Sequence, residues 1–365
     1  MRKHTVTLIA GDGSGPELVA AARTVLDTAA GSAGFHLDWD VRPAGQGALR
    51  SVGELLPAST LDSIRRNGVA LKGPTTTPIG VGHRSVNITI RRELDLYACV
   101  RPVRVWPGAG AVDPGIDVVV VRENTEDVYS GLEYPADSDG AAVVSATLSE
   151  FGHADPGIAF SLKPITPGGS RRIVAFALDH ARKNGRRKVE VGADVYRYPR
   201  TEGLFFEAAR ELGPEYPDIV TATVPVTVLC DSLVRDPADR DVLVLPNLYG
   251  DVISDVTAAL VGGLGMAPGA NIGDRTAVFE ATHGSAPEFA GSNRLNPTAL
   301  ILSGCMLLDH LGEAPTAARI RAAVRSVLEE GRSVTFDLLP PDRAARAVTT
   351  TAYAEAVIER LRDIG

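Results

Sequence analysis

The sequence contains few cysteines and few aromatic residues, and no apolar run is long enough to cross a membrane. Its three cysteines, Cys99, Cys230 and Cys305, are scattered along 365 residues. An odd, scattered set excludes a disulfide framework and a cysteine-based zinc site, and it favours a reducing compartment. Because all three have apolar neighbours, we expect them in the core. A short basic start leads into a glycine-rich turn, so we expect a cytoplasmic, unprocessed protein without a membrane partner.

Positive charge is also scarce. The chain has 37 Lys and Arg against 45 Asp and Glu, a formal net charge of −8, and no basic block. This balance gives no support to a nucleic-acid partner. An anionic small molecule would have to be bound by a local cluster of arginines and lysines.

Apolar residues, by contrast, make up 44% of the chain, enough for a large core and two domains. Strand patterns at 5–9, 69–71, 97–105, 118–121 and 188–191 alternate with helix patterns at 15–30, 58–67, 170–183 and 201–212, and a last helix is expected at 351–362. Repeated β-then-α units predict an α/β fold with a mostly parallel sheet flanked by helices.

One segment, 135–167, breaks this rhythm. It is rich in Gly, Ser, Asp and Pro and contains two short alternating runs, at 141–147 and 158–162. We expect an extended arm or a small antiparallel insertion, of the kind that often pairs between subunits.

Two aspartates stand close together in the stretch Asn-Leu-Tyr-Gly-Asp-Val-Ile-Ser-Asp at 247–255, between the apolar runs 242–245 and 256–261. The pattern predicts strand, turn and helix. If Asp251 starts the helix, Asp255 follows one turn later on the same face. Two carboxylates without a nearby His or Cys suit Mg²⁺ or Mn²⁺ better than zinc. The alternative is that Asp251 caps the helix and Asp255 is only solvated.

A glycine-rich turn, Gly-Asp-Gly-Ser-Gly-Pro at 11–16, follows the first strand. Its spacing is GxGxG and not GxGxxG, and Pro16 enters the helix, which argues against a Rossmann site. The glycines would still let a ligand approach the backbone.

Several arginines lie between residues 91 and 122. Arg91, Arg101 and Arg122 supply the local positive charge, and Ser85 and Asn87 add neutral hydrogen-bonding groups. Planar guanidinium groups bind carboxylates at two points. The alternative is that these arginines form surface pairs with nearby acidic residues, which are Glu93, Asp95, Glu123 and Glu126.

A turn-rich loop at 280–291 can present backbone N–H groups to a nucleotide, and Asn296 and Pro297 precede the next helix. Its His283, taken alone, is more often a hydrogen-bonded structural histidine than a ligand contact.

Five long segments carry a resemblance over almost the whole chain. They read LIAGDGSGPE, LKGPTTTPIGVGHRSVNITIRRELDLYACVRP, VVVRENTEDVYSGLE, LPNLYGDVISDVTAALVGGLGMAPGANIG and EATHGSAPEFAGSNRLNPTALILSG. Together they resemble the β-decarboxylating dehydrogenase family of isocitrate, homoisocitrate, 3-isopropylmalate and tartrate dehydrogenases. The RSxN pattern is similar to the isocitrate branch and not to the isopropylmalate branch, and the chain as a whole resembles the NAD-dependent isocitrate dehydrogenases most. The resemblance implies a two-domain isocitrate/isopropylmalate dehydrogenase-like fold with the site in a cleft. Residues 1–98 and 247–365 would form the large cofactor-binding domain, and 99–246 a smaller one with the arm and the dimer interface.

The resemblance also implies roles for the candidate residues. Arg91, Arg101 and Arg122 would hold the carboxylates of a malate-like core, and Ser85 and Asn87 a third carboxylate. Asp251 and Asp255 would bind the metal, and Tyr129 would protonate the enol after CO₂ leaves.

The cofactor residues follow from the same comparison. Lys72 and Thr77 would line the junction of cofactor and substrate, and a non-Rossmann cofactor site would use Glu280, His283, Gly284 and Asn296. Where NADP-dependent relatives have Lys and Tyr, this chain has Glu288 and Phe289. A carboxylate repels a 2′-phosphate but accepts a hydrogen bond from a 2′-hydroxyl, so NAD is the expected cofactor.

The chain departs from the family pattern in one region. Ungapped alignment puts Asp194 at the position of the catalytic lysine, Tyr196 at that of an asparagine and Thr227 at that of a third metal-binding aspartate. These positions belong to the half-site that a neighbouring subunit supplies in the family. A general base of this kind contributes roughly two to four orders of magnitude in rate.

Three hypotheses follow for a chain expected to form a homodimer. It is a specialised NAD-dependent enzyme, in which Asp194 is the base and Tyr196, Arg197 and Arg200 reshape the pocket. Alternatively, it is one subunit of a hetero-oligomer whose partner supplies the lysine and the aspartate, or it is a non-catalytic NAD-binding protein. The retained NAD loop and Tyr129 favour an enzyme.

Overall fold

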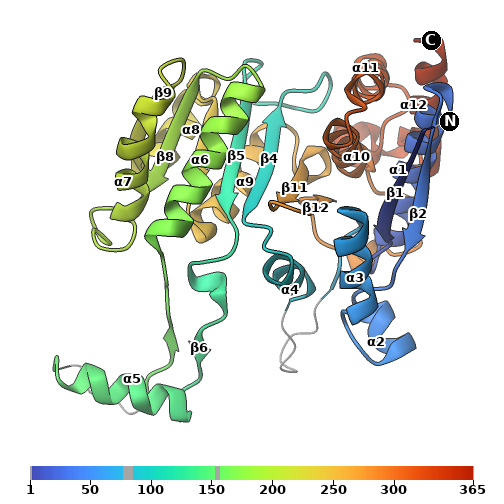
Figure 1. Ribbon diagram of the computed structural model, residues 1–365. Helices are drawn as coiled ribbons and strands as arrows, with labels where there is room; N and C mark the ends of the chain where they lie inside the picture. The colour runs from blue at the N-terminus through green and yellow to red at the C-terminus, as the bar shows by residue number, and fades with distance from the viewer. Residues whose placement is uncertain (1, 77–84, 153–156, 365) are drawn as a thin grey trace.

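The computed structural model describes residues 2–76, 85–152 and 157–364. Within these residues, ten strands form one sheet (Figure 1), in the order β2 (Phe35–Val41), β1 (Arg2–Ile9), β3 (Val69–Lys72), β12 (Ala277–Ala281), β11 (Pro268–Ile272), β4 (Ala98–Arg104), β5 (Asp117–Glu123), β10 (Val242–Leu245), β8 (Lys188–Ala193) and β9 (Val220–Pro225).

The sheet is parallel at both ends and antiparallel in the middle. Strand β11 runs antiparallel to both β12 and β4, and β4 runs antiparallel to β5. The other neighbouring pairs are parallel. The predicted α/β fold with a mostly parallel sheet is therefore confirmed, and the antiparallel strands lie where the candidate site forms.

Helices cover the sheet and extend from it. They are α1 (Gly15–Ser32), α2 (Gln46–Val52), α3 (Ala58–Asn67), α4 (Val86–Glu93), α5 (Asp139–Ser149), α6 (Pro167–Lys183), α7 (Gly203–Leu212), α8 (Val226–Arg235), α9 (Asn247–Leu260), α10 (Thr298–His310), α11 (Ala314–Glu330) and α12 (Thr350–Asp363). Helix α3 has the predicted bounds and ends at Gly68, whose φ of 72° allows the left-handed turn. None of the helices within the described ranges is long and apolar enough to cross a membrane.

Helix α9 begins earlier than predicted. It starts at Asn247 directly after Pro246, so Asp251 lies inside the helix and is not its cap. The turn expected between β10 and α9 is a single proline. Gly250 lets the helix pack closely on β5, because a Cβ at this position would lie 2.6 Å from the Cβ of Arg122.

The arm is present, but its first alternating run is a helix. Strands β6 (Glu133–Tyr134) and β7 (Phe160–Ser161) pair antiparallel, and Figure 1 shows α5 at the end of this ladder, projecting away from the body. The prediction of extended structure at 141–147 was wrong, because alanine favours helix and the Ser138 hydroxyl accepts the Ala141 N–H at 3.2 Å as an N-cap.

Apolar side chains form separate clusters on the two halves of the sheet. One lies beneath α1, α10, α11 and α12, and another beneath α6 and α7. The division into domains 1–98 plus 247–365 and 99–246 stays a prediction that agrees with these clusters.

The cysteines do not share one environment. Cys99 and Cys305 are buried, and burial raises the pKa of Cys305 to about 12. Cys230 is exposed, so its predicted place in the core was wrong. It lies on the outer face of α8, whose Leu229 and Leu233 point inward.

Candidate active site

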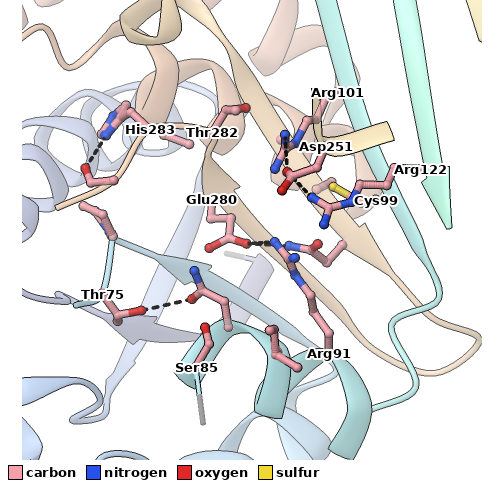
Figure 2. Close-up of a pocket in the computed structure, with 18 of the residues that line it drawn as sticks. Thr75, Ser85, Arg91, Cys99, Arg101, Arg122, Asp251, Glu280, Thr282 and His283 are labelled. Atoms are coloured by element: carbon pink, nitrogen blue, oxygen red, sulfur yellow. Dashed lines mark hydrogen bonds and ion pairs between the residues drawn. The ribbon is translucent and has the colours of Figure 1, made fainter. Parts of the chain in front are cut away.

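A cavity of about 220 Å³ opens where the antiparallel middle of the sheet meets α4 and α9 (Figure 2). The structure brings ten of the predicted site residues to its wall, and these are Ser85, Asn87, Arg91, Arg101, Arg122, Tyr129, Asp251, Glu280, His283 and Gly284. Residues of β4 and β12, which are far apart in the sequence, thus line the same pocket. Thr77 lies outside the described residues.

The side of the pocket formed by β4 and β5 is strongly cationic. Arg101 and Arg122 are 7% and 2% exposed, and Arg122 donates two hydrogen bonds to Asn247 Oδ1, at 2.9 and 2.6 Å, and one to Asp251. Burial, followed by the positive charges of Arg91 and Arg101, lowers the pKa of Arg122 to about 10. None of the three arginines forms the surface pairs that the alternative interpretation required.

Asp251 is the acceptor for this cluster. Tyr129 donates to its Oδ2 at 2.8 Å, and Arg101 Nη1 lies 3.4 Å from its Oδ1. Burial alone would raise the pKa of Asp251, but Arg122 and Arg101 hold it below its ordinary value. Asp255 follows one turn later with its side chain 56% exposed, and burial raises its pKa.

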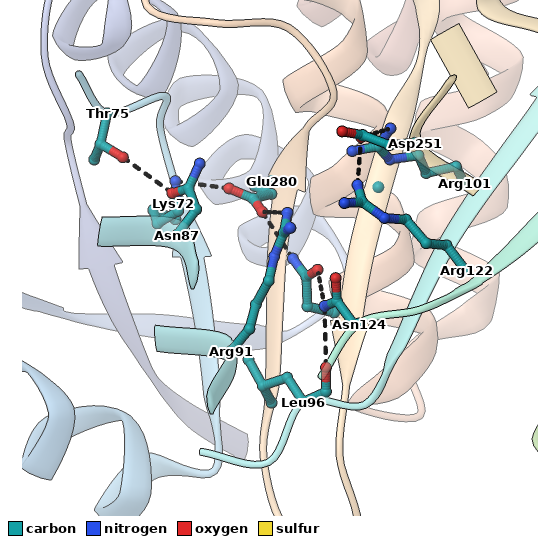
Figure 3. Close-up of polar contacts among 12 residues, drawn as sticks. Lys72, Thr75, Asn87, Arg91, Leu96, Arg101, Arg122, Asn124, Asp251 and Glu280 are labelled. Atoms are coloured by element: carbon teal, nitrogen blue, oxygen red, sulfur yellow. Dashed lines mark hydrogen bonds and ion pairs between the residues drawn. The ribbon is translucent and has the colours of Figure 1, made fainter. Parts of the chain in front are cut away.

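Helix α4 forms the opposite wall. Ser85 precedes its first turn, and Asn87 Oδ1 accepts a hydrogen bond from the Thr75 hydroxyl at 3.0 Å (Figure 3). Arg91, one turn further along α4, points toward Glu280 and is 3.2 Å from it. The first turns of α4 therefore present neutral donors and one guanidinium to the pocket.

Glu280 is the centre of a buried polar network (Figure 3). Its Oε2 lies 2.6 Å from Lys72 Nζ, and its Oε1 accepts from Arg91 at 3.2 Å and from Asn271 at 2.8 Å. Burial alone would raise the pKa of Glu280, but Lys72 and Arg91 lower it to about 2. The carboxylate that the resemblance assigned to the cofactor thus has three partners within the chain, and Lys72 lies beneath the pocket wall.

The loop after β12 contains buried polar atoms that could bind a ligand. His283 Nδ1 contacts the carbonyl of Gly284 at 3.0 Å, whereas His283 Nε2 and Thr282 Oγ1 have no hydrogen-bond partner among the described residues. Burial lowers the pKa of His283. Orphaned buried donors and acceptors of this kind fit a nucleotide bound along the loop.

The remaining predicted cofactor residues lie outside the pocket wall. Glu288 is exposed, and Phe289 stacks on Phe336 with ring centroids 6.0 Å apart. Asn296 is buried and donates to Asp337 at 3.0 Å, and its carbonyl accepts the N–H of Thr298.

The glycine-rich turn packs against this loop. The N–H of Ser14 donates to the Ser285 carbonyl at 2.8 Å, and a Cβ on Gly11 would lie 2.1 Å from the Pro74 carbonyl oxygen. The glycines therefore let other loops of the chain approach the backbone of this turn. Asp12 in this turn accepts hydrogen bonds from the backbone N–H groups of residues 46, 47 and 76.

The family of this chain follows from its sequence. The model of the isocitrate/isopropylmalate dehydrogenase family matches residues 5–357. The chain belongs to this family. Membership confirms the resemblance and the prediction of a dehydrogenase.

Individual relatives match nearly the full chain. It is 42% identical to "Isocitrate dehydrogenase [NADP]" of Thermus thermophilus, covering 98% of this chain and 68% of that protein. It is also 42% identical to "Isocitrate dehydrogenase [NAD] catalytic subunit 5, mitochondrial" of Arabidopsis thaliana, over 98% and 88% of the two chains. The crystal structure of isocitrate dehydrogenase from Methylococcus capsulatus superimposes with a TM-score of 0.89 at 43% identity, covering 98% and 99%.

For a dehydrogenase of this family, the donors on α9 suit a hard divalent cation. Asp251 and Asp255 are the carboxylates on hand, and no group of three or more His, Cys, Asp or Glu that could hold a metal occurs within the described ranges. Mg²⁺ is commonly held by one or two carboxylates together with water and substrate oxygens, so the pair fits when substrate completes the set. Thr227 is exposed at the start of α8 and does not line the pocket.

Asp194, the residue at the family's lysine position, also lies off the pocket of its own chain. It sits at the end of β8, 7% exposed, and its Oδ2 accepts from Arg197 at 2.8 Å. Its N–H donates to fully buried Glu202, which also pairs with Lys163. Asp194 thus belongs to a charged cluster with these three residues, whereas Tyr196 is exposed.

Sequence reasoning missed several polar residues of this family member's site. Asn247, Ser254 and Asn271 hold Arg122, Arg101 and Glu280 in place. Asn247 was in the stretch singled out above, but an amide after a strand does not by itself indicate which guanidinium it will orient.

Proposed function

We propose that this chain oxidises an isocitrate-like 2-hydroxy acid with NAD and a divalent metal, Mg²⁺ or Mn²⁺, and that decarboxylation follows. The observation that carries the proposal is the convergence of Arg91, Arg101 and Arg122 with Asp251 and Tyr129 in one pocket. Three guanidinium groups suit a substrate with several carboxylates. The names of the relatives, which are isocitrate dehydrogenases, support the same substrate class.

In this proposal the chain's own residues orient the substrate and supply one proton. Arg91, Arg101 and Arg122 bind the carboxylates from two sides, and Ser85 and Asn87 reach a third carboxylate from the first turn of α4. Tyr129 protonates the carbon from which CO₂ leaves, and burial, followed by its hydrogen bond to Asp251, raises the pKa of its hydroxyl. It therefore stays protonated until the enol forms.

The bound groups and a neighbouring subunit supply the remaining chemistry. The divalent cation, held by Asp251 and Asp255, would polarise the hydroxyl and carboxylate oxygens of the substrate. NAD would accept the hydride while bound along the loop of His283 and Gly284. The proton of the substrate hydroxyl would pass to Asp194, the base expected from a neighbouring subunit.

We infer NAD as the preferred dinucleotide. Relatives of both cofactor classes are similarly close to this chain, so the preference rests on Glu288 and Phe289. Glu288 is exposed and would repel a 2′-phosphate, whereas it can accept a hydrogen bond from a 2′-hydroxyl.

The direct test is NADH formation by the purified chain with NAD, Mg²⁺ and a series of 2-hydroxy di- and tricarboxylic acids. We expect turnover with an isocitrate-like acid. R91Q should raise KM strongly, because Arg91 faces the pocket with its side chain 12% exposed. R92Q is the matched control, since neighbouring Arg92 is exposed and donates to the Ser130 carbonyl. NADH production with none of the acids would contradict the proposal for the chain acting alone.

A second candidate is a hetero-oligomer, and the residue types at positions 194 and 227 favour it. A second copy of this chain would bring Asp194, which is paired with Arg197, and Thr227 to the shared site, whereas a different family member would bring a lysine and a third metal-binding aspartate. The test mixes this chain with a family member that has the lysine and the aspartate. A mixture no more active than its separate components would rule the second candidate out, and the homodimer would remain.

A further inference from the structure

One guanidinium of the pocket stands between the two candidate metal ligands. Arg101 Nη1 lies 3.4 Å from Asp251 Oδ1 and 3.5 Å from Asp255 Oδ1, and it donates a short hydrogen bond to the Ser254 hydroxyl. Figure 3 shows the side chains of Arg101 and Arg122 both directed at Asp251. A single nitrogen thus contacts three side chains of α9.

This position is the one a counter-ion would take. The Arg101 side chain is 9% exposed, and it comes from β4, across the pocket edge from α9. A cation that bound Asp251 and Asp255 together would lie against a guanidinium of like charge, beside an Asp255 side chain that is 56% exposed. Repulsion between like charges at such separations persists near a protein surface, although the water around Asp255 weakens it. The arrangement therefore satisfies the two carboxylates internally and disfavours a free metal ion.

The same guanidinium lines the pocket and can change partners. A substrate carboxylate offers Arg101 a two-point hydrogen-bonded contact, which is stronger than a single nitrogen shared at 3.4 and 3.5 Å. Movement of Arg101 toward such a ligand would leave Asp255 without this partner and Asp251 with Arg122 alone.

We propose that Arg101 is an internal counter-ion that keeps divalent cations off Asp251 and Asp255 until an anionic ligand draws it into the pocket. The inference rests on the proposed function, because it takes these aspartates as the metal ligands. It makes metal and polycarboxylate binding mutually dependent, and by linkage each ligand raises the affinity of the other by the same factor.

Ser254 is the positioning residue in this scheme. It is 1% exposed, it accepts from Arg101, and its own hydroxyl donates to the Asp251 carbonyl at 2.8 Å. S254A removes the contact that holds Arg101 between the carboxylates and leaves every charge in place. S254A therefore tests the position of the Arg101 guanidinium without changing its charge.

The experiment measures Mn²⁺ binding by electron paramagnetic resonance, with and without tricarballylate, a tricarboxylate that cannot be oxidised because it has no hydroxyl. Wild type should bind Mn²⁺ weakly alone and about tenfold or more tightly with tricarballylate, within the usual range of coupling between sites. R101Q should bind Mn²⁺ tightly without tricarballylate and gain little from it. S254A should lie between the two, and it keeps the test open if R101Q does not fold.

R92Q is the control for overall charge, because it removes an exposed arginine of the neighbouring helix α4 and should behave as wild type. Tight Mn²⁺ binding by wild type without tricarballylate would overturn the counter-ion role and leave the metal site itself standing. Equal Mn²⁺ affinities in wild type, R101Q and S254A would overturn it as well. If no protein binds Mn²⁺ even with tricarballylate, the metal assignment of the proposed function fails first.

Discussion

Replacing Glu280 by Gln should destabilise the protein by about 3 kcal/mol at pH 7. Glu280 is 8% exposed and is the acidic partner of Lys72 and Arg91, so the variant leaves two buried cations without a countercharge. Removing one partner of a buried ion pair costs roughly 3–5 kcal/mol. The lowered pKa leads to the same magnitude, because a fall from the ordinary 4.5 to about 2 corresponds to about 3 kcal/mol of stability.

The pH dependence of the same variant has a definite sign. The folded-state pKa of Glu280 is lowered, so its contribution is complete above about pH 4.5 and is lost as the pH falls toward about 2. The difference in unfolding free energy between wild type and E280Q should therefore be largest near neutral pH and shrink below pH 4.5. Urea unfolding followed by circular dichroism, repeated from pH 7 to pH 3, measures this difference directly.

Two companion variants sharpen the test. K72M/E280Q removes both charges of the closest pair and should cost less than E280Q alone, because Lys72 no longer remains buried without a partner. E330Q is the surface control, since Glu330 pairs with the half-exposed Arg360 and its loss should leave stability nearly unchanged. A cost below ~1 kcal/mol for E280Q, or one that does not change with pH, would refute the reasoning.

Three further outcomes follow from single contacts. Burial lowers the pKa of His180 to about 4, so wild type should lose stability as the pH falls from 6.5 to about 4, by up to ~3 kcal/mol, and H180N should lose less in urea unfolding. Y353F removes the buried hydroxyl that accepts from Thr298 at 2.7 Å and should cost about 1–2 kcal/mol in the same assay. E288K should shift the ratio of kcat/KM values toward NADP by about fivefold, the effect of ~1 kcal/mol between exposed charges, measured by initial rates with both dinucleotides.

Each of these outcomes has a matched comparison. H36N, at an exposed histidine of β2, should keep the acid sensitivity of wild type, and an identical pH profile for H180N would contradict the role given to His180. T298V combined with Y353F should cost little more than Y353F alone, because Y353F has already broken the hydrogen bond between the two side chains. An unchanged NADP preference in E288K would show that Glu288 does not meet the 2′ position.

The sequence predicted the members of the pocket better than their contacts. Arg91, Arg101 and Arg122 stood out because a chain of negative net charge has few other places to bind an anion. Which partner each arginine takes depends on the side-by-side packing of β4, β5 and α9, and spacing along the chain does not contain that information. The division of labour in which Asn247 orients Arg122 and Ser254 orients Arg101 is therefore visible only in three dimensions.

Two of the differences between prediction and structure have local explanations. The run at 141–147 alternates well enough to suggest a strand. Its alanines and the N-cap at Ser138 nevertheless favour a helix, and the paired strands β6 and β7 lie on either side of this helix in the sequence. Cys230 has apolar neighbours in sequence, but on an amphipathic helix adjacent residues face different directions, and this one faces outward.

The antiparallel strands at the centre of the sheet form a rigid part of the pocket. Cys99 pairs with Asn271 across β4 and β11, and both line the pocket, so the spacing of hydrogen-bonded strands fixes the distance between these two residues. That spacing does not adjust to a longer or bulkier acid. Side chains outside the sheet, such as Thr75 and Asn87, are not held by strand pairing, so a library that aims to change the substrate range should vary them and leave the strand residues unchanged.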